Sequence, residues 1–144
     1  MLKQNIGRID HVAILVYPQN FESCVERLAR TLQISFQRAY REDLGLKIAT
    51  DWDAGLEILA PTGPESALWA QLQKRGEGHM SIIFGVKDFE DARKRAEREG
   101  FSAGPEVGLI GSEPWADRFS VLRETSLSEI CGINLVLGQV EPKY

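Results

Sequence analysis

The chain contains two similar segments at a fixed spacing along the sequence. His11 begins the apolar run His-Val-Ala-Ile-Leu-Val, and Asn20-Phe21-Glu22 follows it. His79 begins the run His-Met-Ser-Ile-Ile-Phe, and Asp88-Phe89-Glu90 follows it, so the two histidines are 68 positions apart. Short apolar runs rich in β-branched residues predict buried strands, and a polar residue before an amphipathic segment predicts a capped helix. Two such strand–helix units predict two modules within one domain of 144 residues.

Turn residues and changes in apolar periodicity extend this repeat along the whole chain. They predict the order βαβββ, then a linking helix, then βαβββ again. The interpretation is a single α+β domain, with module one at about 7–62, the linking helix at 63–77 and module two at about 78–140. Helices are expected near 21–32 and 89–99, and strands near 9–16, 34–40, 44–50, 55–60, 79–86, 101–107, 117–123 and 131–138.

Composition excludes several classes of function. A net charge of −4 argues against general nucleic-acid binding, which needs a basic surface to displace counterions from phosphates. No apolar run approaches the length of a membrane span, and the N-terminal residues are too polar and too short to lead a signal peptide. Cys24 and Cys131 lie far apart without metal-binding spacing, so we expect reduced thiols and a cytoplasmic protein. The sequence indicates no nucleotide cofactor.

Several short motifs recur in an order that is typical of one superfamily. They are Ile9–Ala13, Gly55–Pro61, Glu65-Ser66 leading to Gly76–Gly78, the strand to Val86 with Asp88-Phe89, and Gly132–Val136. Together they resemble the vicinal oxygen chelate superfamily, which includes glyoxalase I, bleomycin-resistance proteins, extradiol dioxygenases and methylmalonyl-CoA epimerase. The pattern looks closest to the epimerase branch. The resemblance implies paired βαβββ modules that form a curved half-barrel sheet around a shared small-molecule pocket, in a homodimer.

The resemblance also implies a set of metal ligands. Members of the superfamily usually hold one divalent metal ion with four side chains, one from the first strand and one from the last strand of each module. In this chain the four positions fall on His11, Glu57, Ser81 and Asn134. The first two are ligand types, whereas Ser81 and Asn134 stand where the superfamily usually has His and Glu. One divalent metal ion, held mainly by module one, is therefore the only cofactor that the resemblance suggests.

His79 allows a second alignment of the two modules. The ungapped repeat pairs His79 with His11, whereas the superfamily spacing before Val86 pairs Ser81 with His11. Two residues along a strand span about 6–7 Å, so His79 could replace a ligand at 81 only if a β-bulge shifted the strand. We favour Ser81 as the equivalent of His11 and keep His79 as a further candidate metal ligand.

The first hypothesis for function is an enzyme. The shared chemistry of the superfamily is the stabilisation of an oxyanion, usually an enolate, while a nearby base moves a proton. His11 and Glu57 are the expected catalytic residues, and a metal-free variant would use Glu57 as base with His11 or Asn134 donating to the oxyanion. The expected reaction is an isomerase, epimerase or lyase reaction rather than a dioxygenation. Substrate contacts, with an anionic or CoA-like molecule, are expected from Ser81, Asn134, Trp115, Arg118 and Arg123.

Two alternatives remain open. A non-catalytic ligand-binding or resistance protein of the bleomycin-resistance type would explain a degenerate metal site, since it needs a groove and no chemistry. A subunit with a vestigial groove is the other alternative. At the level of single residues, His11 could be a hydrogen-bonded core histidine and Glu57 a surface carboxylate on an edge strand. The partners that we expect are a small-molecule ligand and a second copy of the chain, with neither nucleic acid nor membrane.

Overall fold

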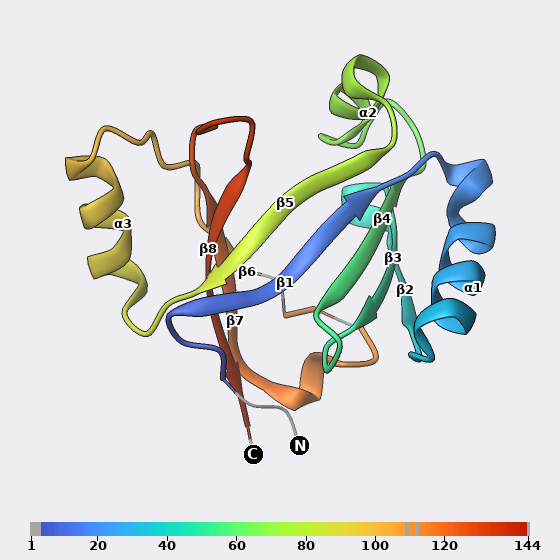
Figure 1. The fold of residues 1–144 in the computed structure, drawn as a ribbon, viewed down its shortest axis with the longest axis horizontal. Helices are drawn as coiled ribbons and strands as arrows, with labels where there is room; N and C mark the ends of the chain where they lie inside the picture. Colours follow the sequence, from blue (N-terminus) through green and yellow to red (C-terminus); the bar gives the residue numbers. More distant parts are fainter. Residues whose placement is uncertain (1–3, 109, 112, 144) are drawn as a thin grey trace. The chain divides into compact units, whose positions relative to one another are not determined.

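The computed structural model describes residues 4–108, 110–111 and 113–143. The chain divides into two compact units, a central unit, Ala13–Met80, and a terminal unit, Met1–Val12 with Ser81–Tyr144. Apart from short 3₁₀ turns, the chain order is β1 α1 β2 β3 β4, then α2, then β5 α3 β6 β7 β8 (Figure 1). The predicted α+β class and the repeated βαβββ order are therefore confirmed. Strands β1 (Arg8–Leu15) and β5 (Gly78–Gly85) each pass from one unit to the other.

The central unit contains an antiparallel set of strands beside a helix. Strand β2 pairs with β3, and β3 pairs with β4, in both cases antiparallel. Directly after β1, the backbone N–H of Val16 donates to the carbonyl of Leu59 in β4 at 2.9 Å. The elements of this unit are α1 (Phe21–Leu32), β2 (Gln37–Arg41), β3 (Leu46–Asp51), β4 (Leu56–Pro61) and α2 (Trp69–Arg75).

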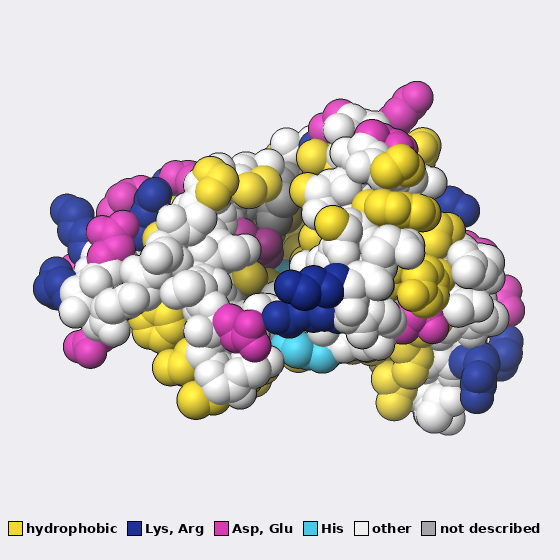
Figure 2. Space-filling view, turned by 90° about the horizontal axis from the view of Figure 1, so that it is seen from above, with side chains coloured by type: hydrophobic (Ala, Val, Ile, Leu, Met, Phe, Trp, Pro, Cys, Tyr) yellow, Lys and Arg dark blue, Asp and Glu magenta, His cyan; other side chains and the backbone are white. Residues whose placement is uncertain are grey.

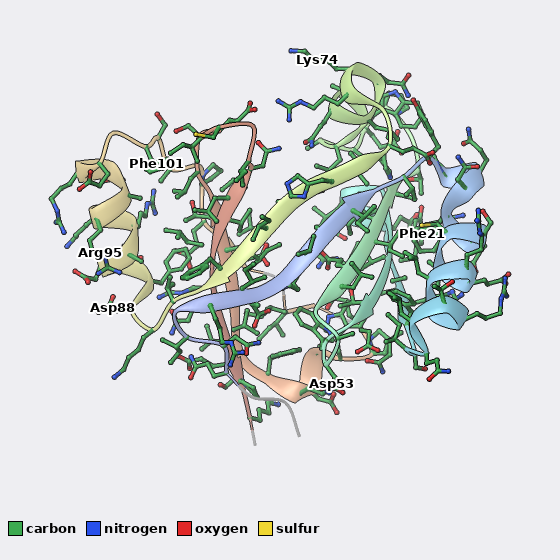
Figure 3. All side chains as sticks on the ribbon, viewed as in Figure 1. Phe21, Asp53, Lys74, Asp88, Arg95 and Phe101 are labelled. Atoms are coloured by element: carbon green, nitrogen blue, oxygen red, sulfur yellow. The ribbon has the colours of Figure 1, made fainter. Side chains whose placement is uncertain are left out.

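The apolar face of α1 supplies the core of the central unit. Figure 3 shows Phe21 on the side of this helix that faces the strands, and Phe21 and Val25 are almost fully buried. The core comprises Val16, Phe21, Val25, Ala49, Ile58 and Ala60. Asn20 occupies the N-cap position, as the sequence predicts, but its side chain makes no cap hydrogen bond and instead donates to Glu77 at 2.9 Å.

The terminal unit places one helix beside a mixed set of strands. Strand β5 pairs in parallel with β8, which pairs antiparallel with β7, and β7 pairs antiparallel with β6. Helix α3 lies beside β8 (Figure 1), and a core of Ala92, Leu127 and Leu137 forms there. Asp88 caps α3 as predicted, because its carboxylate accepts the N–H of Asp91 at 2.9 Å. The elements are α3 (Phe89–Arg98), β6 (Val107–Gly108), β7 (Phe119–Ser126) and β8 (Leu135–Pro142).

The linking helix is shorter than the sequence predicts. The expected range was 63–77, whereas α2 covers Trp69–Arg75. Residues before it form turns, in which the N–H of Ser66 donates to Gly63 and the N–H of Leu68 donates to the Ser66 hydroxyl at 3.3 Å. A serine that bonds to nearby backbone groups competes with helical hydrogen bonds, and this explains the later start.

Two expected strands of module two also differ. The strand expected at 101–107 is reduced to Val107–Gly108 because Gly104-Pro105 interrupts it. The strand expected at 131–138 begins only at Leu135. Cys131 and Gly132, with φ of 51° and 78°, form a tight turn that closes between Ile130 and Ile133. Asn134, which we had placed in the last strand, therefore lies just before it.

Gly138 is a position where the strand packing demands glycine. A Cβ atom there would lie 2.7 Å from Cγ2 of Ile83. We therefore expect Gly138→Ala to lower the free energy of unfolding by about 1–3 kcal/mol, measured by urea titration. The matched control is Gly108→Ala in β6, because no described atom lies within 4 Å of a Cβ there. Equal effects of the two substitutions would contradict the packing argument.

Candidate functional site

His11 is a buried histidine with a carboxylate at one ring nitrogen. It lies in the part of β1 that belongs to the terminal unit, and it is 1% exposed. Its Nδ1 is 2.7 Å from Oδ2 of Asp10, which is itself buried. An ionised carboxylate only accepts hydrogen bonds, so Nδ1 carries the proton at this contact. In the neutral ring Nε2 is then the nitrogen that can accept a proton.

A second carboxylate faces the other ring nitrogen. Oε1 of Glu124, in β7, lies 3.6 Å from Nε2 of His11, and the Glu124 side chain is 19% exposed. Within the terminal unit the strands run in the order β1-β5-β8-β7-β6, so these two side chains meet across β5 and β8. Gly138 in β8 stands opposite Glu124 and carries no side chain to separate them. Carboxylates at both nitrogens would stabilise an imidazolium formed by proton transfer.

Ser81 and Asn134 belong to the same unit as His11. Ser81 is 4% exposed and lies in β5. Asn134 is half-buried, and its backbone carbonyl accepts the N–H of Ile82 at 2.9 Å, which ties it to β5. Both residues remain candidates for substrate contacts, and neither has the histidine or glutamate side chain that a metal site would use there.

Glu57 and His79 belong to the central unit. Glu57, in β4, is half-buried and stands opposite Thr50 in β3, whose hydroxyl donates to Glu57 Oε2 at 3.4 Å. Thr50 is fully buried, so this end of the carboxylate lies against the sheet. His79 is exposed near the start of β5. Catalysis by Glu57 and metal binding by either residue stay predictions.

The three substrate-contact residues predicted around β7 have different surroundings. Arg123 lies over the ring of Phe89, 4.5 Å from its centroid, and donates to Gln139 at 3.0 Å and to Glu106 at 3.1 Å. These contacts hold its guanidinium on the side of β7 where α3 begins. Trp115 is buried, and Arg118 is half-buried at the end of a 3₁₀ turn before β7. Anion binding by the two arginines stays a prediction.

The described residues do not fit a complete metal site. Among residues 4–108, 110–111 and 113–143, no group of three or more His, Cys, Asp or Glu side chains is arranged to hold a metal ion. In the terminal unit, Nε2 of His11 and Oε1 of Glu124 are two possible metal-ligand atoms. Nδ1 of His11 already contacts Asp10. Zinc sites usually use at least three protein ligands. No step proposed below depends on a metal ion.

Sequence reasoning missed both carboxylates that contact His11. Neighbouring residues in a strand point to opposite faces, so strict alternation places Asp10 away from His11. Glu124 lies one residue beyond the strand expected at 117–123. It is two residues after the buried Leu122, so both lie on the same face of the strand. A carboxylate that shares a face with a buried leucine was the available indication of a functional position.

A hollow lies in the central unit. It has a volume of about 560 Å³ and an apolar lining that includes Ile14, Val16 and Leu28, with Arg27 and Glu77 among its polar residues. Cys24 also lines it, and burial, followed by the nearby Glu77 carboxylate, raises the pKa of its thiol. A thiol with a raised pKa is a poor nucleophile, so nothing in this hollow indicates chemistry.

Basic and acidic side chains are scattered over the face that Figure 2 shows, and no broad basic region is visible there. No helix of the described residues is long and apolar enough to span a membrane.

No protein-family description and no curated protein matches the sequence, but solved structures do. A variant of Streptomyces coelicolor methylmalonyl-CoA epimerase, in complex with 2-nitronate-propionyl-CoA, is 25% identical with a TM-score of 0.71, covering 94% of this chain and 98% of that one. The epimerase of Mycobacterium tuberculosis is 21% identical with a TM-score of 0.72, covering 100% and 94%. A hypothetical protein of Bacillus halodurans is 20% identical with a TM-score of 0.76, covering 95% and 96%. The chain has the fold of these proteins, which confirms the resemblance to glyoxalase-like proteins and epimerases.

Proposed function

We propose that the protein is an epimerase or related isomerase that moves a proton next to the carbonyl of an anionic acyl thioester such as a branched acyl-CoA. The similarity in fold to methylmalonyl-CoA epimerases, over nearly the full length of both chains, supports the reaction class. The observation that carries the proposal is the buried His11 with carboxylates at both ring nitrogens. Buried titratable groups with specific charged partners are concentrated at functional sites.

The proposed chemistry begins with removal of the substrate proton. Asp10 holds His11 in the tautomer with hydrogen on Nδ1, so Nε2 accepts the proton next to the thioester carbonyl. The imidazolium that forms is stabilised by Asp10 on one side and Glu124 on the other. The enolate oxygen needs hydrogen-bond donors, for which Ser81 and Asn134 are the candidates.

Epimerisation also needs a proton delivered to the opposite face of the enolate. We assign this step to Glu57, whose hydrogen bond from Thr50 holds one carboxylate oxygen against the sheet. If His11 performs the first step and Glu57 the second, each enantiomer is deprotonated by a different residue. This two-group scheme is what the variants described in the Discussion test.

The test is hydrogen exchange on methylmalonyl-CoA in deuterium oxide. We expect the protein to exchange the proton next to the carbonyl at least ten times faster than buffer does, because general acid–base catalysis is typically worth about 10²- to 10⁴-fold. The disappearance of this proton is followed by NMR, and circular dichroism reports interconversion of the enantiomers. Exchange no faster than in buffer, with folded protein in excess, would contradict the proposed function.

A second candidate is a ligand-binding protein without catalysis. It is favoured by Ser81 and Asn134, which stand at two of the four positions where the resemblance implies metal ligands. In the same experiment, acyl-CoA that shifts the NMR signals of the protein and undergoes no accelerated exchange would support this candidate against the epimerase.

A further inference from the structure

We propose that Asn5 and Asp10 are positioning residues that fix the ring of His11, and that the N-terminal segment 4–7 acts as a clasp that holds Asn5 in place. Gly85 in β5 is the anchor of this clasp. The inference rests on the proposed function only for its effect on catalysis, because the positioning itself is a property of the free protein.

The positioning starts from the two oxygens of one buried carboxylate. The side-chain amide of Asn5 donates to Oδ1 of Asp10 at 3.1 Å, and Oδ2 of Asp10 lies 2.7 Å from Nδ1 of His11. Each oxygen of Asp10 therefore has a different partner. Rotation of the carboxylate would break both contacts at once, so Asn5 restrains the orientation in which Asp10 accepts the hydrogen bond from Nδ1–H.

Asp10 needs such a restraint because of its place in the strand. It precedes His11 directly, and adjacent side chains of a strand start on opposite faces. The Asp10 carboxylate must turn toward His11 for the 2.7 Å contact, and a carboxylate that is 8% exposed requires hydrogen-bond partners to remain buried. Asn5 supplies one of them from outside the strand.

The clasp reaches this position by close contact with Gly85. The N–H of Gly7 donates to the carbonyl of Gly85 at 2.9 Å. The carbonyl oxygen of Asn5 lies so near that a Cβ atom at Gly85 would be 1.5 Å from it. Ile6, between these two contacts, is 46% exposed, so burial of its side chain does not hold the segment. Backbone contact with a glycine therefore holds the clasp in place.

The experiment compares the wild-type protein with Asn5→Asp. This substitution keeps the side chain's shape, removes the donor and places a second carboxylate beside Asp10. At a pH where the ring is neutral, ¹⁵N NMR of His11 should change from the Nδ1–H tautomer to a mixture, and kcat for the exchange reaction should fall about 10- to 100-fold with KM within about twofold. Asn5→Gln keeps the amide, so it should partly retain both the Nδ1–H tautomer and the wild-type kcat. Gly85→Ala should give the same change in tautomer by displacing the clasp.

Matched controls keep the result interpretable. Asn20→Asp removes an amide that donates to Glu77 in the central unit, and it should leave the His11 signals and kcat unchanged. The chain has two histidines, so the spectrum of His11→Gln identifies the signals. A wild-type tautomer and wild-type kcat in Asn5→Asp would overturn the inference. A changed tautomer in a protein that catalyses no exchange would support the positioning and contradict the proposed function.

Discussion

Replacing His11 with glutamine is expected to lower kcat/KM for proton exchange from the enantiomer that His11 deprotonates by about 10²- to 10⁴-fold, the usual contribution of a general acid or base. Glutamine keeps hydrogen-bonding groups near Asp10 and Glu124 but cannot accept a proton at neutral pH. The loss should appear in kcat, since proton transfer occurs only in the transition state. The measurement is the initial rate of α-proton exchange on each enantiomer of methylmalonyl-CoA in deuterium oxide, with substrate concentration varied to separate kcat from KM.

A buried polar control separates this effect from loss of stability. Thr125 is 1% exposed in the same unit, and its hydroxyl donates to the carbonyl of Gly104 at 2.7 Å. Thr125→Val should lower the free energy of unfolding by about 1–3 kcal/mol, because it leaves the carbonyl unpaired, and should leave kcat/KM within about twofold. If His11→Gln retains more than a tenth of wild-type kcat/KM on both enantiomers, His11 does not transfer the proton.

Glu57→Gln and Glu124→Gln are expected to have different effects on stereochemistry. If Glu57 transfers the proton on one face, Glu57→Gln should lower interconversion of the enantiomers by about 10²- to 10⁴-fold. It should still allow exchange of the proton that His11 removes, from one enantiomer only. Glu124→Gln should slow exchange from the enantiomer that His11 deprotonates, because it weakens the stabilisation of the imidazolium, and should leave exchange by Glu57 from the other enantiomer in place.

Enantiomerically pure methylmalonyl-CoA in deuterium oxide distinguishes these outcomes. NMR follows exchange, and circular dichroism follows interconversion, for each enantiomer separately. Glu90→Gln, an exposed carboxylate on α3, is the control and should behave as wild type. Normal interconversion by Glu57→Gln would remove Glu57 from the mechanism and would contradict its prediction from the sequence.

Apolar periodicity predicted most of the secondary structure. The element boundaries that it predicted wrongly are those set by local turns. Helices α1 and α3 and the cap at Asp88 follow directly from the pattern of apolar and capping residues. The late start of α2, the short β6 and the start of β8 at Leu135 depend on turns made by residues such as Ser66 and Gly132. The pattern of apolar residues carries little information about such turns.

The candidate site was predictable only in part. His11 stood out because it begins an apolar run that recurs in the sequence, and the structure buries it. Glu57 has a defined hydrogen bond in its own unit, and its proposed catalytic role awaits the variants above. Asn134 proved to lie before the last strand rather than in it. The carboxylates that contact His11, those of Asp10 and Glu124, were not predicted.

The repeat of two βαβββ modules follows from the amino-acid sequence alone, because strand and helix periodicities depend on residues close together in the chain. Which charged groups meet at His11 depends instead on how the strands pack in three dimensions. The contact with Glu124 depends on the order of four strands and on the missing side chain at Gly138. The contact of Asn5 with Asp10 depends on a backbone path that passes against Gly85. Such contacts join residues across strands, where alternation along one strand cannot predict them.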